Sequence, residues 1–206
     1  MCIRDRHYSD IDPNLPFLAG ESAEAIVEKL TEIQMESLRN TADVIDYDML
    51  NLAVDRILNV KRNIVLFGIS PNSLMGQLLR RKLGSIGIIL TVAQTDESGM
   101  LAATLRDGDC AILVSYSGNN MEREPMRYLK RLKKNHVNLI AVTSDGDNYL
   151  RDNIDCILTI SSREKLYSKI GSFTTEESIL HLFNIIYACC FSRNFIHNYN
   201  YKLTNS

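Results

Sequence analysis

AILVSYSGNN, residues 111–120, joins four apolar residues to a run of hydroxyl, glycine and amide residues. The apolar part, Ala111–Val114, has the length and composition of a fully buried β-strand, and the polar part predicts a loop. The same order occurs at Ile64–Phe67, which is followed by GISPNS, residues 68–73. Continuous apolar strands of this kind occur in parallel sheets that helices cover on both faces. The stretch therefore predicts an α/β fold in which polar loops leave the ends of buried strands.

Around this stretch, five short apolar runs alternate with segments of helical spacing. Such alternation, with right-handed crossovers, predicts a doubly wound five-stranded parallel sheet flanked by helices. The expected strands are Ile64–Phe67, Ile86–Val92, Ala111–Val114, Leu139–Val142 and Ile157–Ile160. The expected helices between them are Ser73–Leu83, Gly99–Leu105 and Glu122–Lys134.

Helices are also expected before and after this alternation. The first begins near its candidate N-cap Ser22, and the second covers residues 49–58 with Asp46 or Asp48 as its cap. A final apolar helix is expected from residue 176 to about residue 196.

The first 20 residues differ from the rest of the chain. Met1–Arg6 has no useful periodicity, and residues 8–20 carry two of the four prolines. We interpret residues 1–20 as an arm or the remnant of an interdomain linker, and residues 21–206 as one domain.

The overall composition is that of a globular domain, with 206 residues, 45% hydrophobic and 23% charged. A formal net charge of −2 gives no indication of nucleic acid or an anionic membrane as partner. No apolar run reaches the roughly 18 residues of a membrane span, and no leader opens the chain, so we expect a cytoplasmic protein. The five cysteines are odd in number and form no CxxC pair, which favours free buried thiols over disulfides or zinc.

Ligands of doubly wound sheets bind beyond the carboxyl ends of the strands. Two polar loops, Gly68–Ser73 and Ser115–Asn120, are expected there, each leading into a helix whose N-terminal N–H groups suit a phosphate. Neither loop contains a dinucleotide or nucleotide-triphosphate motif, and no cofactor is expected. A third polar loop, from Ser161 to Thr175, precedes the last helix, whereas residues 144–146 are expected to form only a turn. The alternative is that Ser73 and Ser117 are only helix caps and Gly118 only a turn residue.

The strand followed by Ser-Tyr-Ser-Gly-Asn-Asn resembles the Ser-x-Ser-Gly-x-Thr phosphate loop of SIS (sugar isomerase) domains, and Gly68–Ser73 resembles their first ligand loop. The likeness covers roughly residues 25–196 and implies a flavodoxin-like three-layer sandwich that binds a phosphosugar. It implies that hydroxyls of the second loop contact the phosphate and that the first loop lies near the sugar. Asn120 stands where threonine is usual, but an amide also donates hydrogen bonds. The implied ligand-binding residues are Ser70, Asn72, Ser73, Ser115, Ser117, Gly118, Asn120, Ser172 and Thr174.

Within this family the chain most resembles the effector domain of RpiR-type transcriptional regulators. The two leading helices, FGISPNS, VSYSGNN and KIGSFTTEES carry the likeness. Those regulators have an N-terminal helix-turn-helix before a proline-containing linker, which residues 8–20 resemble. The resemblance implies a sensor of a phosphorylated sugar or amino sugar, paired as a homodimer or homotetramer. It contacts DNA only through a helix-turn-helix that is missing here.

The alternative function is a stand-alone aldose–ketose isomerase, which needs a base to move a proton between two carbons. SIS isomerases place a glutamate after a Gly-Ser pair near the start of the last helix, but here Gly171-Ser172 is followed by Phe-Thr-Thr. Glu176 stands one residue further along, about 100° around the helix. Glu176 and Glu177 are expected to complement the helix dipole instead, so no catalytic residue is assigned.

Other candidate residues have simpler interpretations. The basic run from Arg127 to Lys134 is expected to be the solvated face of an amphipathic helix. The histidines are expected to be structural or exposed, and His181 could reach a ligand only if it faced the ligand edge of the sheet. These histidines are His7, His136, His181 and His197.

Overall fold

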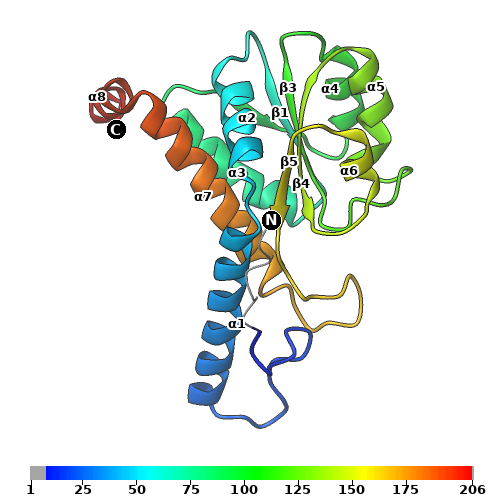
Figure 1. Ribbon diagram of the computed structural model, residues 1–206, viewed down its shortest axis with the longest axis vertical. Helices are drawn as coiled ribbons and strands as arrows, with labels where there is room; N and C mark the ends of the chain where they lie inside the picture. The colour runs from blue at the N-terminus through cyan, green and yellow to red at the C-terminus, as the bar shows by residue number, and fades with distance from the viewer. Residues whose placement is uncertain (1–7, 206) are drawn as a thin grey trace.

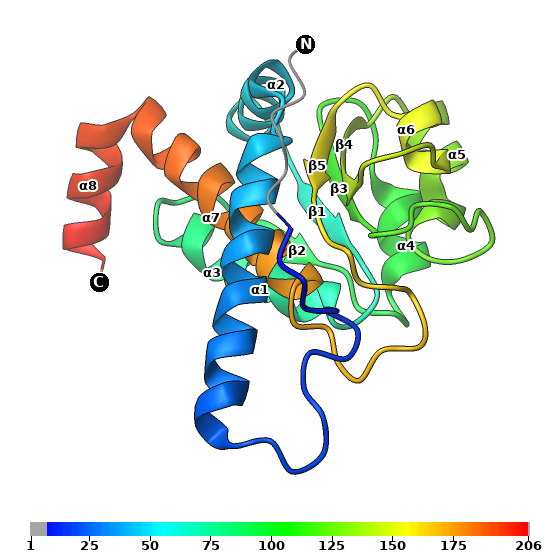
Figure 2. The same ribbon diagram turned by 60° about the horizontal axis from the view of Figure 1, so that its bottom comes forward.

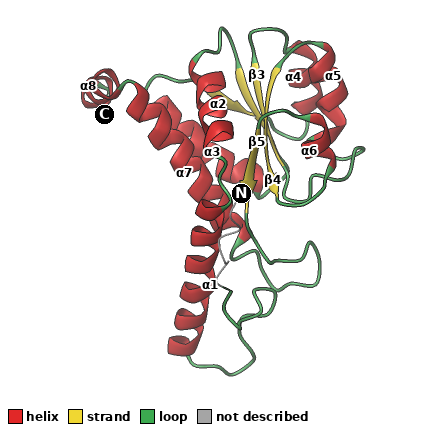
Figure 3. Ribbon diagram, viewed as in Figure 1, coloured by secondary structure: helices red, strands yellow, loops and turns green. Residues whose placement is uncertain are grey.

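The computed structural model describes residues 8–205, which form a five-stranded sheet with helices on both faces (Figures 1 and 3). The elements in chain order are α1 (Ala23–Asp43), α2 (Tyr47–Leu58), β1 (Ile64–Phe67), α3 (Asn72–Gly84), β2 (Leu90–Val92), α4 (Ser98–Thr104), β3 (Cys110–Val114), the 3₁₀ helix η1 (Met126–Tyr128), α5 (Leu129–Lys134), β4 (Asn138–Ser144), α6 (Tyr149–Asn153), β5 (Ile157–Ile160), α7 (Thr175–Arg193) and α8 (Phe195–Thr204).

Every neighbouring pair of strands is parallel, and the strand order is β2-β1-β3-β4-β5. The doubly wound α/β fold expected from the sequence is therefore confirmed. Strands β1 and β5 have the predicted bounds, but β2 is shorter than the expected Ile86–Val92. The chain leaves α3 in a turn with Gly87 at φ 82°, and its pairing with β1 begins only at Leu90.

The two faces of the sheet carry separate apolar clusters. Ile64 and Leu66 of β1 pack with α2, α3 and α7, whereas Val65 and Phe67 pack with α4, α5 and α6. This division follows from the alternation of side chains along a strand. Figure 2 shows the two groups of helices on opposite sides of the sheet. Because both faces are covered, every residue of β1 and β3 is buried.

Helix α1 projects beyond the sheet, and only its C-terminal half packs against the body of the domain (Figure 1). Buried hydroxyls make this contact, which we call the hydroxyl seam: Ser37, Thr41, Ser161 and Ser178. Ser37 Oγ donates to the Thr174 carbonyl over 2.8 Å, and Ser178 Oγ donates to the Ser161 carbonyl over 2.7 Å. Thr41 Oγ1 accepts from Ser161 N over 3.2 Å. The seam joins α1, the end of β5 and the start of α7.

The cap predicted for the first helix is confirmed, and the structure selects one of the two candidates offered for the second. Ser22 Oγ accepts a hydrogen bond from Ala25 N over 3.3 Å at the start of α1. At α2 the cap is Asp46, whose Oδ1 accepts from the backbone N–H groups of Asp48 and Met49.

Two helix predictions were wrong in part. The segment Glu122–Lys134 is helical only from Met126, because Pro125 restricts the residue before it and has no N–H to donate. The last helix ends at Arg193, since Asn194 has non-helical dihedral angles (φ −138°, ψ 58°), and a separate α8 follows. The short helix α6 was not predicted. In α5, Leu129 and Leu132 are buried and the basic side chains are exposed, which agrees with an amphipathic helix.

The described part of the arm, residues 8–20, runs beside α1 and beside the loop between β5 and α7 (Figure 2). We call residues 161–174 the β5–α7 loop. The rings of Phe17 in the arm and Phe173 in the loop have centroids 6.2 Å apart, and Ile170 N donates to the Asn14 carbonyl over 3.1 Å. The described arm is therefore packed against the domain. Its origin as an interdomain linker stays a prediction.

The four described cysteines are free, as expected. Burial raises the pKa of the Cys110 and Cys190 thiols to about 12 and that of Cys156 to about 11. Cys2, Met1–Arg6 and His7 lie outside the described residues.

Among the described helices, none alone is long and apolar enough to cross a membrane. Helices α7 and α8 pass that test of length and composition only as a pair, and they are bent by 103° relative to each other.

Candidate functional site

The candidate site lies where the winding direction of the sheet reverses. From β1 the chain crosses to β2 on one side, and then it returns past β1 to β3 on the other. The loops that leave the carboxyl ends of β1 and β3 consequently lead to opposite sides of the sheet, and ligands of doubly wound sheets usually bind between two such loops. These are the two loops that the sequence singled out, Gly68–Ser73 and Ser115–Asn120.

The loop after β1 is fixed against the end of β3. Asn72, the first residue of α3, donates from Nδ2 to the Val114 carbonyl over 3.2 Å. A Cβ atom on Gly68 would lie 3.1 Å from Asn72 Cβ and 3.4 Å from the Val114 carbonyl oxygen, so glycine allows this close approach. Ser70 is exposed, and Ser73 is half-buried in the first turn of α3.

The loop after β3 is tightly folded around Gly118. This residue has φ 60°, and an added Cβ would lie 2.5 Å from Asn148 Oδ1, so a side chain is excluded both by conformation and by space. Ser115 Oγ accepts from Gly118 N over 3.2 Å, and Leu150 N donates to the Gly118 carbonyl over 3.2 Å. Gly118 thus fixes the loop to α6, whereas the next two residues, Asn119 and Asn120, are exposed.

Several donors in this second loop are unused. Among the described residues, the backbone N–H groups of Ser117, Asn119 and Asn120 have no hydrogen-bond partner, nor does the Ser117 hydroxyl. Asn120 uses its Oδ1 to accept from Glu122 N over 3.1 Å, which leaves its amide N–H groups outside that bond. The unpaired N–H groups of Asn119 and Asn120 are consecutive, and consecutive N–H groups in a loop are a common means of binding an anion.

The structure argues against the alternative that Ser73 and Ser117 are helix caps. Pro71 precedes α3 and Pro125 precedes η1, and neither helix has a side-chain cap. The expectation that Ser115–Asn120 leads directly into a helix was also wrong, since the next helical residue is Met126. Anion binding at this loop would therefore use its own N–H groups rather than a helix dipole.

Tyr116 connects the second loop to the third. Its hydroxyl donates to the Ser162 carbonyl over 2.6 Å, so the loop after β3 contacts the start of the β5–α7 loop across β4. Ser144 is the last residue of β4, and residues 145–147 form the bends that follow it, with Gly146 at φ 88°, so the predicted turn begins one residue later than expected. The structure thus brings all three predicted loops into one connected set.

The third loop is organised by a buried carboxylate. The Glu164 side chain has 0% exposure and accepts from Thr174 N over 2.5 Å, from Thr174 Oγ1 over 3.0 Å and from Thr175 Oγ1 over 2.9 Å. Lys169 Nζ lies 2.9 Å from Glu164 Oε2. The carboxylate therefore occupies the N-terminal end of α7, where the helix dipole favours negative charge.

The hydroxyl groups around Glu164 donate their protons to other groups of the protein. An ionised carboxylate only accepts hydrogen bonds, so Thr174 and Thr175 donate their hydroxyl protons to Glu164. Ser162 Oγ accepts from Glu164 N and lies 3.0 and 2.8 Å from the two threonine hydroxyls, so its one proton goes to one of them. Ligand contact by Thr174 stays a prediction, and donation from this hydroxyl to a ligand requires that it leave Glu164. The other candidate here, Ser172, is half-buried.

Two acidic residues near the start of α7 have shifted pKa values in opposite directions. Burial alone raises the pKa of Glu164, but the hydrogen bonds from Thr174, Lys169 and Thr175 outweigh it, and the pKa lies below its ordinary value. The pKa of Glu176 is raised by burial and then by the charge of Glu164, with Lys169 acting in the opposite sense. Glu164 is thus held as an anion, while Glu176 is easier to protonate.

Sequence reasoning missed the residues that hold the third loop. Arg163 and Tyr116 were not assigned a role because their partners are distant in sequence, and Glu164 was not because its partners lie 5 to 11 residues further along an irregular loop. The histidines were assigned none either: His136 and His197 are exposed, and His181 is half-buried in α7. Among the described residues, no three histidine, cysteine or acidic side chains gather as a candidate metal site.

The sequence is similar to a known protein family and to a known regulator. The family model for the SIS domain matches residues 57–186, more than half of the chain. An uncharacterized HTH-type transcriptional regulator of Clostridium perfringens is 28% identical over 174 residues, which are 84% of this chain and 61% of the relative. The chain therefore spans less than two thirds of the length of that relative.

Solved structures of both regulators and enzymes share the fold. NanR of Vibrio vulnificus, complexed with ManNAc-6P, has a TM-score of 0.78 and 19% identity, covering 91% of this chain and 68% of that one. The sugar isomerase domain of an RpiR transcription factor of Sphaerobacter thermophilus has a TM-score of 0.73 and 20% identity, covering 85% and 95%. Phosphoheptose isomerase GmhA of Neisseria gonorrhoeae has a TM-score of 0.67 and 14% identity, covering 81% and 98%.

The lowered pKa of Glu164 gives a signed prediction for stability. A carboxylate with a lowered folded-state pKa stabilises the fold above its ordinary pKa and loses that effect as the pH falls through the folded value. We expect Glu164→Gln to lower the free energy of unfolding at pH 7 by about 1–3 kcal/mol, because charged hydrogen bonds are lost. Below the ordinary pKa of 4.5, the difference in free energy of unfolding between wild type and variant should become smaller. Urea unfolding followed by circular dichroism at several pH values measures both effects.

The matched control is Glu177→Gln, which removes one negative charge from the first turn of the same helix. It should change the free energy of unfolding by less than about 1 kcal/mol, the range for a helix-dipole interaction. If the free energies of unfolding of wild type and Glu164→Gln changed with pH in the same way, the role given to Glu164 would be contradicted.

Proposed function

The chain belongs to the SIS domain family, and from that premise we propose that it is the phosphosugar-sensing effector domain of an RpiR-like transcriptional regulator. The observation that carries the proposal is the set of unpaired donors in the Ser115–Asn120 loop, at the reversal point of a parallel sheet. A phosphate group presents several acceptor oxygens and negative charge, and backbone N–H and hydroxyl groups match both features.

The proposed ligand has its phosphate at the second loop and its sugar toward the first. Ser115, Ser117 and Asn120 would donate to the phosphate, with Gly118 shaping the loop. The sugar hydroxyls would face Ser70, Asn72 and Ser73, and Ser172 and Thr174 would close the third side. The start of α7 is a poor phosphate position, because the buried Glu164 carboxylate already supplies negative charge there.

The regulatory role rests on the relatives. The Clostridium perfringens regulator aligns with 84% of this chain, and this chain spans 61% of that regulator. We propose that the whole protein carries a helix-turn-helix before the arm, and that DNA is bound only through it. A homodimer or homotetramer in the cytoplasm would then respond to a phosphorylated sugar or amino sugar, without a cofactor.

The first prediction of this proposal concerns phosphate dependence. The 206-residue chain should bind at least one member of a panel of hexose and amino-sugar phosphates, ManNAc-6P included, because the unpaired loop donors would bind phosphate oxygens. Isothermal titration calorimetry measures the affinity. Each unphosphorylated sugar of the panel is the matched control, and equal affinity for a sugar and its phosphate would contradict the proposal.

The second prediction concerns Ser117, whose hydroxyl has no partner among the described residues. Ser117→Ala should weaken binding of the phosphosugar by about 1.5–3 kcal/mol, the range for a hydrogen bond to a charged group. Thermal unfolding should change little, because no intramolecular bond is lost. Thr104→Ala removes an exposed hydroxyl at the end of α4 and should leave the affinity unchanged. Wild-type affinity in Ser117→Ala would remove this residue from the site.

A sugar-phosphate isomerase is the second candidate function, and Glu176 is the observation that favours it. Glu176 is half-buried at the start of α7, and its raised pKa brings it closer to that of a general base working near neutral pH. Against this role, the Gly171-Ser172 pair is followed by Phe173 and two threonines rather than by a carboxylate. The hydroxyl of one of these threonines, Thr174, already donates to Glu164.

Proton exchange distinguishes the two functions. We expect no exchange at C1 or C2 of a bound sugar phosphate in deuterated water, because no base is assigned within reach of those carbons. Nuclear magnetic resonance at saturating ligand detects the exchange directly. Exchange that disappears in Glu176→Gln, with binding retained, would establish the isomerase and overturn the sensor.

A further inference from the structure

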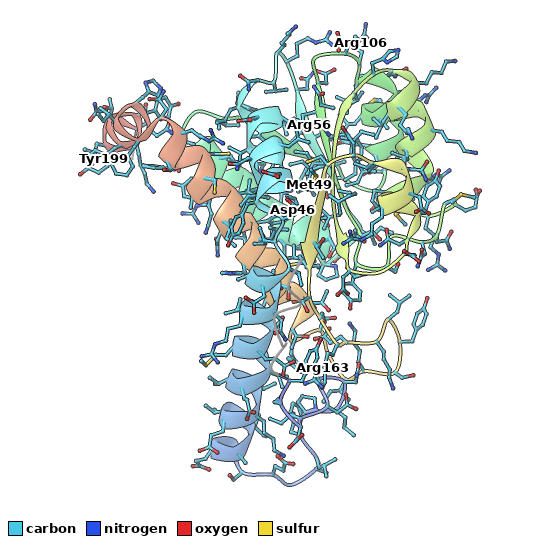
Figure 4. The ribbon with its side chains drawn as sticks, viewed as in Figure 1. Asp46, Met49, Arg56, Arg106, Arg163 and Tyr199 are labelled. Carbon is cyan, nitrogen blue, oxygen red and sulfur yellow. The ribbon has the colours of Figure 1, made fainter. Side chains whose placement is uncertain are left out.

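Arg163 and Glu164 are neighbours in sequence whose side chains point to opposite sides of the β5–α7 loop. Glu164 points inward to Thr174 and Thr175 at the start of α7. Arg163 points outward to the arm and α1, and Figure 4 labels it in the region where these segments and the β5–α7 loop lie together. One dipeptide therefore contacts both the candidate site and the arm.

The outward contacts of Arg163 form a dense polar cluster. Its guanidinium donates to both Glu36 carboxylate oxygens, over 2.9 and 3.0 Å, and to the carbonyls of Ser9 and Ile11, each over 3.1 Å. Ser9 in turn donates from its N–H and hydroxyl to Glu36, each over 2.8 Å. The Glu36 side chain is only 10% exposed, whereas the Arg163 side chain is 31% exposed, so the carboxylate is more shielded from water than the guanidinium.

Asn14 makes a second connection between the arm and the loop. It is 6% exposed, its Oδ1 accepts from Lys165 N over 2.7 Å, and its carbonyl accepts from Ile170 N over 3.1 Å. Lys165 directly follows Glu164, and Ile170 directly follows Lys169, the cation of the Glu164 ion pair. The arm therefore fixes the loop backbone on both sides of the segment that supports Glu164.

We propose that the arm and the phosphosugar site are energetically coupled through Arg163 and Glu164, so that an attached arm favours ligand binding. This inference rests on the proposed function. Coupling between two sites is reciprocal, so bound ligand must also hold the arm more firmly. The physical reason is order: a loop already fixed by the arm loses less conformational freedom when a ligand fixes its inner side.

The test compares Arg163→Ala with wild type in the full 206-residue chain. Detaching the arm should weaken binding of the sugar phosphate at least about 5-fold, the lower end of measured couplings between sites. The probes are ManNAc-6P and glucose 6-phosphate, titrated calorimetrically. The control is Arg193→Ala, at the other end of α7, whose guanidinium contacts Asn51 and Asp55 and no described residue of the arm. The affinity of this variant should equal that of wild type.

Hydrogen exchange provides a readout that does not depend on the ligand. The Thr174 amide donates to Glu164 Oε1, so peptides covering the start of α7 should exchange faster in Arg163→Ala than in wild type or Arg193→Ala. In wild type, adding ligand should slow exchange at Lys165 and Ile170, whose amides contact Asn14. If the arm amides exchanged faster in Arg163→Ala while exchange at the start of α7 stayed as in wild type, the coupling would be overturned.

Asn14→Ala tests the same coupling from the arm. It keeps the coupling testable if Arg163→Ala fails to fold. It removes the Lys165 bond and leaves Arg163 in place, so a smaller loss of affinity in the same direction is expected. If wild type binds a sugar phosphate and both folded variants bind it equally well, the coupling is wrong while the proposed function stands. If wild type binds no sugar phosphate of the panel, the proposed function loses its support, and exchange at the Thr174 amide alone decides whether arm and loop are coupled.

Discussion

Parallel strands must all end at the same edge of their sheet, and this constraint determines the rest of the structure. Because β1, β3, β4 and β5 run in one direction, the polar loops that follow them gather at that edge. The reversal of winding between β1 and β3 separates two of these loops, while Asn72 and Tyr116 connect each loop to the next. A site built in this way takes its rigidity from the buried strands and its chemistry from exposed loop residues.

A buried carboxylate adds a second constraint, since it is tolerated only with enough donors around it. Glu164 obtains them from an amide, two threonine hydroxyls and Lys169, all within the segment that ends at the first residue of α7. The β5–α7 loop therefore has a defined shape although it contains no regular secondary structure. The arm completes this arrangement from outside, through Arg163 and Asn14.

The elements formed by local pattern were predictable, and those formed by distant contacts were not. Apolar runs fixed β1 and β5, and the Ser22 and Asp46 caps were readable because a cap acts within three residues. The helical spacing of residues 122–134 was misleading. Leu129 and Leu132 suggest one helix over the whole segment, but Pro125 delays its start to Met126. The site loops were found from their composition and from the rule on strand ends. The role of Glu164 had no sequence signal, because a glutamate in a polar loop looks solvated until its partners are known.

The hydroxyl seam holds α1 at one end only, and this gives the helix the mechanics of a lever. Ser37 lies 14 residues from the start of the helix at Ala23, which is about 21 Å at 1.5 Å per residue. A rotation of about 5° at this pivot would carry the free end through about 2 Å, since displacement grows with distance from the fulcrum. The pivot shares the Thr174 carbonyl with the first turn of α7. Small adjustments of the bonding there are thus magnified at the far tip, where the arm joins the helix.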